Sequence, residues 1–106
     1  MNVEIFVKQL EAIGHPTRLN VYRALARAGT EGLAVGDLHE KLGIAGSTLS
    51  HHLQRLITTG LITQERRATT LICRANYPTM TALVGFLIDE CCADVPKLAA
   101  DETEIP

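Results

Sequence analysis

The most informative part of the chain runs from STLSHHLQRLITTG, residues 47–60, into LITQERRATTLICR, residues 61–74. Apolar side chains in the first segment recur at the three- and four-residue spacing of an α-helix. The second segment holds two alternating, β-branched stretches on either side of residues 66–68, which read RRA. We therefore predict a helix over 47–59, ended by Gly60, and then a small hairpin with a basic tip.

Helical periodicity continues on both sides of this segment. It predicts helices over 3–13, from Pro16 up to Gly29, over 35–42, and from Asn76 through an apolar stripe that reaches Cys91. The chain is therefore expected to be mainly α with a small β-hairpin, in the order α-α-α-α-β-β-α. Two short helices joined by a glycine turn and followed by a hairpin constitute a winged helix-turn-helix.

Length and composition fit one small folded domain. The chain has 106 residues, of which 46% are hydrophobic and 21% charged, so we expect neither disorder nor a large enzyme. It lacks an apolar run near the ~20 residues of a membrane helix, and it lacks a secretory leader pattern. We expect a cytoplasmic protein without membrane contact, with one domain over 1–92 and an acidic C-terminal tail over 93–106.

Charge is distributed unevenly along the chain. The net charge is −2, but residues 41–74 carry five Lys or Arg against Glu65 alone, a balance of +4, whereas residues 89–106 have a balance of −5. A local basic segment is compatible with a nucleic-acid face. The sequence also has no glycine-rich phosphate loop, HExxH or nucleophile elbow, so we expect no enzyme.

The helix over 47–59 is expected to enter the major groove of double-stranded DNA and to read base edges with its outward side chains. The Ser47 hydroxyl is expected to cap this helix by accepting a hydrogen bond from a free backbone N–H group. Arg66 and Arg67 would reach the DNA backbone or minor groove, while His52 would lie against the domain. The alternative is an ordinary solvated helix face. The outward residues are Ser47, Thr48, Ser50, His51, Gln54 and Arg55.

Three segments resemble the ArsR/SmtB family of bacterial metalloregulators: HPTRLNVYRAL (15–25), VGDLHEKLGI (35–44) and STLSHHLQRLITTGLI (47–62). The resemblance covers roughly residues 8–90. It implies a homodimeric winged helix that represses its own operon, with the first and last helices at the dimer interface. Two departures concern helix caps, because Ala34 and Ala45 stand where the family usually has a polar residue.

Two familiar inducer sites of this family are missing. The arsenic site would need cysteines at the start of the third helix, where the chain has LAVGD, residues 33–37. The zinc site would need histidine on the last helix, but no histidine follows His52. We therefore expect neither the classical arsenite site nor the common zinc site.

Three cysteines remain as candidate inducer ligands: Cys73, Cys91 and Cys92. An odd number without a secretory leader favours free thiols, and thiolates prefer soft, thiophilic centres. Their arrangement resembles an atypical ArsR subgroup that responds to trivalent arsenic, including methylarsenite. We expect Cys73 near the end of the second hairpin strand and the pair near the end of the last helix. The site would then lie between subunits or within one chain.

Two alternatives stay open for the cysteines. They could form a redox or reactive-sulfur switch in a repressor of the same fold, which requires accessible thiols of low pKa. The acidic neighbours Asp89, Glu90 and Asp94 would raise thiol pKa values and so disfavour that reading. The cysteines could also be inert, because a free cysteine is often a small core side chain. No constitutive cofactor is expected.

Overall fold

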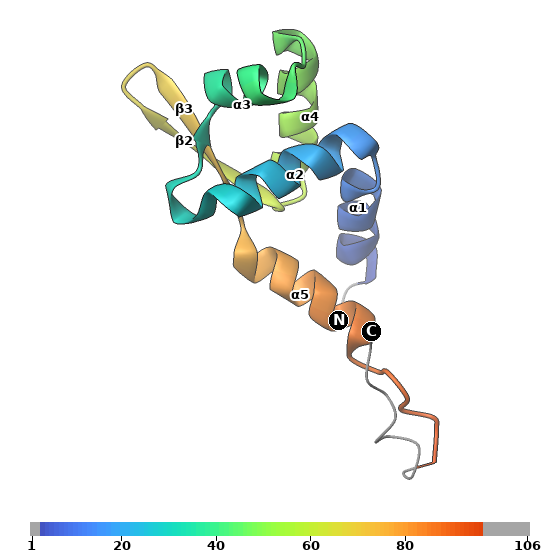
Figure 1. Cartoon of the computed structure of the whole chain (residues 1–106). Helices are drawn as coiled ribbons and strands as arrows, with labels where there is room; N and C mark the ends of the chain where they lie inside the picture. The colour runs from blue at the N-terminus through green and yellow to red at the C-terminus, as the bar shows by residue number, and fades with distance from the viewer. Residues whose placement is uncertain (1–2, 97–106) are drawn as a thin grey trace.

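The computed structural model describes residues 3–96, and this range contains five α-helices and one small antiparallel sheet (Figure 1). The order of elements confirms the predicted winged helix-turn-helix. The elements are α1 (Val3–Ile13), α2 (Pro16–Ala28), a short 3-10 helix η1 (Gly29–Glu31), β1 (Leu33–Ala34), α3 (Val35–Leu42), α4 (Gly46–Thr58), β2 (Ile62–Arg67), β3 (Thr70–Ala75) and α5 (Tyr77–Ile88).

The sheet contains a strand that the sequence did not predict. The order of strands is β1-β3-β2, and the two residues of β1 pair with Ile72 and Cys73 of β3. A two-residue strand is too short to show any alternation of polar and apolar side chains. The strand nevertheless pairs the segment before α3 with the hairpin of β2 and β3, which we call the wing. The helix-turn-helix and the wing are therefore joined by one sheet.

The hairpin differs from the prediction at its tip. Arg66 pairs with Leu71 and Arg67 with Thr70, so both arginines lie within β2 and the connection is made by residues 68 and 69. Ala68 adopts a φ of 55°, in the left-handed region that favours glycine. The predicted tip of residues 66–68 is therefore wrong by two positions at its start and by one at its end, but both arginines remain at the far end of the wing.

The start of α4 also differs from the prediction. The helix begins at Gly46, its N-cap is Ala45, and no side chain hydrogen-bonds to this end of the helix. Ser47 therefore lies in the first turn and is not the cap. The N-cap of α3 is Ala34, again without a side-chain bond, which confirms that both family caps are missing. By contrast, Asn76 caps α5 through a bond from the Thr79 backbone N–H.

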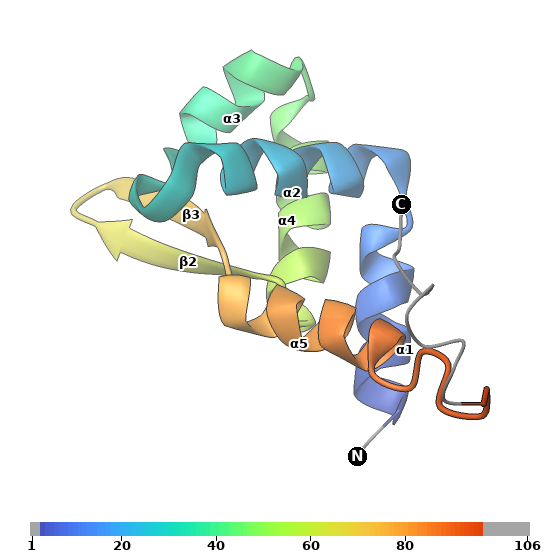
Figure 2. The same ribbon diagram turned by 60° about the horizontal axis from the view of Figure 1, so that its bottom comes forward.

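The core lies between α2, α3, α4 and the sheet, and leucines from each helix fill it. Leu25, Leu38, Leu49 and Leu56 have no exposed surface. Helices α1 and α5 lie side by side away from the tip of the wing (Figures 1 and 2), and the rings of Phe6 and Phe86 stack between them at 4.2 Å.

The outer faces of α1 and α5 are apolar and uncovered. These exposed side chains are Val3, Ile5, Val7 and Leu10 on α1, and Tyr77, Val84, Leu87 and Ile88 on α5. Patches of this kind on a soluble protein mark interaction sites. No helix within residues 3–96 is both long and apolar enough to cross a membrane.

The last helix ends earlier than the apolar stripe predicts. It stops at Ile88, and the following residues form turns. Cys91 and Cys92 therefore lie beyond α5 instead of on it, which corrects the prediction. Most of the acidic tail predicted over 93–106 lies outside the described residues.

Candidate nucleic-acid interface and cysteine sites

The polar side of α4 faces solvent as a continuous surface. All six residues predicted to face DNA are exposed, while Leu49, Leu53 and Leu56 on the opposite side are buried. The structure therefore places the six on the outward side of one helix. These are Ser47, Thr48, Ser50, His51, Gln54 and Arg55. We call this surface the reading face.

The reading face offers both side-chain and backbone groups for hydrogen bonding. Gln54 Nε2 lies 3.5 Å from Thr58 Oγ1 in the next turn, a long contact that leaves the amide available to a partner. At the start of α4 no side chain occupies the first N–H groups. Uncapped N–H groups at a helix N-terminus bind anions such as DNA phosphate.

The wing is braced by a charge cluster that the sequence did not reveal. Arg74 donates to Glu65 Oε1 at 2.7 Å and to the Thr30 carbonyl at 2.8 Å, and Arg67 lies 3.4 Å from Glu65 Oε2. The bond from Arg74, followed by the one from Arg67, holds the pKa of the Glu65 carboxyl below its usual value. Arg74 pairs with Thr63 and Glu65 with Ile72, so Glu65 and Arg74 are diagonal neighbours on one face of the hairpin. This register could be found only once the hairpin turn was known.

His52 lies against the domain, as predicted, and is only 8% exposed. Its Nδ1 atom lies 3.2 Å from Nη1 of Arg18, and its ring centroid lies 4.9 Å from that of His15. Arg18 also donates to the Ala12 carbonyl at 2.6 Å. Neither Arg18 nor His15 was singled out in the sequence, although both belong to the HPTR segment.

The three cysteines occupy two separate places. Cys73 is fully buried in β3 beneath its cross-strand neighbour Gln64, whose Nε2 lies 3.5 Å from the sulfur. Burial raises the pKa of the Cys73 thiol. Cys91 is exposed and Cys92 is half-buried, and their Sγ atoms lie 3.7 Å apart.

A single chain does not bring the three sulfurs together. Helix α5 has 12 residues, about 18 Å at 1.5 Å per residue, and it separates Cys73 from the pair. Among the described residues, no group of three His, Cys, Asp or Glu side chains could hold a metal ion. The predicted three-cysteine site therefore does not exist within one chain in this conformation.

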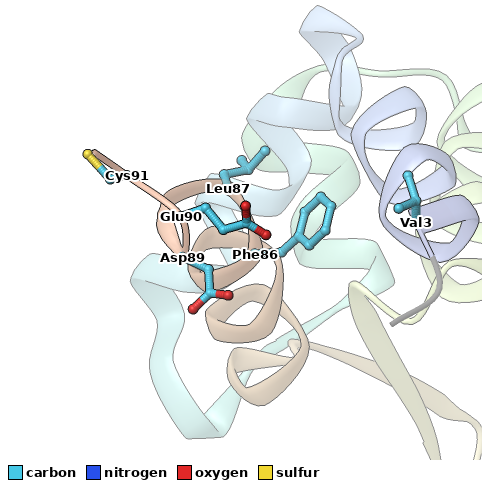
Figure 3. Close-up of a pocket in the computed structure, with 6 residues that line it drawn as sticks. All are labelled: Val3, Phe86, Leu87, Asp89, Glu90 and Cys91. Carbon is cyan, nitrogen blue, oxygen red and sulfur yellow. The ribbon is translucent and has the colours of Figure 1, made fainter. Parts of the chain in front are cut away.

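Cys91 also borders a pocket of about 560 Å³ between the start of α1 and the end of α5. Figure 3 shows its sulfur directed away from the apolar side chains of Val3 and Phe86. The pKa of the Cys92 thiol is raised, mainly because of its bond with Cys91 and then by desolvation. The carboxylates expected to raise thiol pKa values do not contribute to this shift.

Comparison with known proteins identifies the fold and the class of protein. A family model for a helix-turn-helix domain matches residues 13–65. The nodulation protein NolR of Rhizobium meliloti is 32% identical over 88 residues, covering 83% of this chain and 70% of NolR. A candidate arsenical resistance operon repressor of Halobacterium salinarum is 39% identical over 57 residues, 54% of this chain and 47% of that protein.

Solved structures agree with this assignment. An ArsR-like transcriptional regulator from a Rhodococcus species superposes with a TM-score of 0.77 at 18% identity, covering 94% of this chain and 92% of that chain. The homodimeric winged helix-turn-helix DNA-binding domain of a Mycobacterium bovis regulator gives a TM-score of 0.67 at 25% identity, covering 84% and 82%. These relatives are transcriptional regulators and not enzymes, and the chain belongs to the ArsR family of DNA-binding transcriptional regulators.

Proposed function

We propose that this regulator represses transcription by binding operator DNA as a homodimer, and that a thiophilic inducer bound by cysteine thiolates releases it. The observation that carries the DNA-binding part is the reading face on α4. It combines exposed hydroxyl, amide, imidazole and guanidinium groups with an uncapped helix N-terminus. Such groups pair with base edges and phosphates in the major groove.

The wing supports the same proposal. Arg66 and Arg67 are exposed at its far end, and the salt bridges found within residues 3–96 involve Arg67 and Arg74 but not Arg66. A guanidinium in this position contacts the DNA backbone or minor groove beside the groove that α4 occupies. Contacts to phosphate carry no sequence information, so those that the wing makes to the backbone strengthen binding to all sequences alike.

Dimerisation is proposed from the uncovered faces of α1 and α5. Of the 12 residues in α5, only Leu83 is buried, although most of the helix is apolar. A second copy packed on α1 and α5 would cover these side chains. It would also present two copies of α4 to a two-fold operator, as the helix-turn-helix geometry requires. The Mycobacterium bovis relative is described as homodimeric, which supports this arrangement.

A trivalent arsenical is the proposed inducer. The Cys91 and Cys92 sulfurs are 3.7 Å apart and accessible, so they supply two soft ligands, which is the number that methylarsenite needs. Arsenite would need a third sulfur. Cys73 could provide it from the partner subunit, or after the wing moves and exposes it. Such a movement would couple inducer binding to the DNA-binding state, because only differential contacts shift the equilibrium between two states.

A second candidate function is a redox switch, and the same 3.7 Å separation favours it. A peroxide would oxidise the two thiols to a disulfide, releasing two protons and two electrons, and would itself be reduced to water. The raised pKa of Cys92 opposes rapid reaction, because the thiolate is the reactive form.

The decisive experiment is retardation of a labelled duplex taken from the promoter region upstream of this chain's own gene. We expect the reduced protein to retard the duplex and methylarsenite or arsenite to release it. Release by hydrogen peroxide alone would favour the redox candidate. If an excess of unrelated DNA competes as well as the promoter does, the operator-binding proposal is wrong.

A further inference from the structure

A polar cluster joins three helices behind the reading face. Helix α4 packs against α1 and α2 (Figure 2). Arg18 on α2 lies at the junction, with Nε donating to the Ala12 carbonyl near the end of α1 at 2.6 Å and Nη1 facing His52 Nδ1 at 3.2 Å. Arg18 therefore links a helix with an uncovered apolar face to the helix that carries the reading face.

The contact between Arg18 and His52 fixes the protonation state of the histidine. A guanidinium has only donors, so His52 Nδ1 must act as the acceptor and the neutral ring carries its proton on Nε2. A proton added to Nδ1 would remove the acceptor and place an imidazolium beside the guanidinium. The bond and the positive charge on His52 thus exclude each other.

The surroundings of His52 oppose a positive charge. His15 lies before α2 with its ring centroid 4.9 Å away, and His51 on α4 has its centroid 5.8 Å away. Burial, followed by the charges of His15, Arg18 and His51, lowers the pKa of His52. From α1, Lys8 and Glu11 line a pocket with Arg55, which lies further along α4 than His52.

We propose that Arg18 and His52 are positioning residues that hold α4 against the end of α1, and that protonation of His52 releases α4 and weakens DNA binding. The inference rests on the proposed function, because it assumes that α4 reads DNA. A neutral His52 keeps the reading face oriented relative to α1. Protonation of His51 on the reading face itself would have the opposite effect, since an imidazolium attracts phosphate.

The test compares operator affinity at pH 7.5 and pH 5.0 for the wild type, His52→Asn and His39→Asn. The Asn Oδ1 atom takes the place of the histidine Nδ1 as acceptor and does not titrate in this range. His39 on α3 is exposed, and its Nδ1 bonds the Ile44 carbonyl instead of Arg18, so it serves as the control for loss of a histidine outside the cluster. The probe is the labelled promoter duplex described above, at constant ionic strength.

We expect the wild type and His39→Asn to lose at least about threefold more affinity on acidification than His52→Asn, because uptake of one proton changes a binding constant by up to about tenfold per pH unit. Equal pH profiles for the wild type and His52→Asn would overturn the proposal. If the wild type fails to bind the promoter at pH 7.5, the proposed function itself is at fault.

A second measurement uses only the free wild-type protein, so it depends neither on DNA nor on whether the variants fold. The ring signals of the free wild-type protein, followed by NMR, should show His52 titrating below about 6.5, the ordinary pKa of histidine. The α4 amide signals should shift with the same midpoint. The proposal would be contradicted if the pKa of His52 is at or above the ordinary histidine value, or if the α4 amide signals do not shift as His52 titrates.

Discussion

Helices α4 and α5 have similar lengths but differ in how far the rest of the chain covers their apolar side chains. Helix α4 buries Leu49, His52, Leu53 and Leu56 within its own chain and exposes a polar face. Helix α5 is more apolar yet buries only Leu83. A single chain therefore provides everything that α4 needs to fold, but leaves α5 without a cover. The partners we propose for the two faces differ accordingly, DNA for α4 and a second copy of the chain for α5.

The largest effect is expected from a substitution that disrupts the proposed dimer interface on α5. Replacing Leu87, which is 56% exposed, by Glu places a charge in the proposed interface. Central interface positions contribute about 2 kcal/mol or more, so dimer dissociation should rise at least about 30-fold, measured by sedimentation. Leu19→Glu makes the same change on α2, at a side chain that is 43% exposed, and this control should remain dimeric.

The next effect concerns the cysteines that follow α5. Cys91→Ser and Cys92→Ser should bind promoter DNA like the wild type, because neither residue is on the reading face. Both should lose release by methylarsenite, a coupling of about 1–3 kcal/mol, measured by gel retardation. Cys73→Ser distinguishes a three-sulfur site from a two-sulfur site. It should abolish release by arsenite but leave release by methylarsenite unchanged. A protein lacking all three thiols that is still released would refute cysteine sensing.

Substitutions on α4 and the wing should separate specific from general DNA binding. Gln54→Ala should cost about 1–3 kcal/mol of preference for the promoter over unrelated DNA if the amide contacts a base. Arg66→Ala should weaken binding to both kinds of DNA equally and reduce the slope of log affinity against log salt by about 1. Fluorescence anisotropy at several salt concentrations measures both. If Gln54→Ala keeps the normal preference for the promoter, the proposed placement of α4 in the major groove is wrong.

The smallest effect is expected at the uncapped start of α4. Ala45→Ser supplies a hydroxyl at the N-cap, where the backbone is already extended, and should raise the free energy of unfolding by about 0.5–1 kcal/mol. Urea denaturation measures this change. Ser47→Ala serves as the control, because Ser47 is not the cap and its loss should leave stability within about 0.5 kcal/mol.

The sequence predicted most of the fold because α1, α2, α3 and α4 each combine an apolar stripe with a glycine or proline boundary. It missed β1, because two residues carry no periodicity, and it overestimated α5, because apolar residues continue beyond the last helical turn. The reading face could be predicted, since helical spacing fixes which side chains point outward. The contact between Arg18 and His52 could not, because residues 34 apart meet only through the packing of α2 on α4.

The cysteines show the same limit. Their chemistry can be read from the sequence, but the burial of Cys73 under Gln64 depends on the register of the hairpin. The separation of Cys73 from the pair follows from the direction of α5. Both features are tertiary, so spacing along the chain could not decide between a site within one chain and a site between two.

The number of chains in the DNA complex tests the central claim most directly. Native mass spectrometry of the wild type with the promoter duplex should show two chains on each site, because we propose that a second copy covers α1 and α5 and that a two-fold operator takes one α4 helix from each copy. Leu87→Glu should then bind the same duplex far more weakly than the wild type. A complex with one chain, bound equally well by Leu87→Glu, would contradict the account.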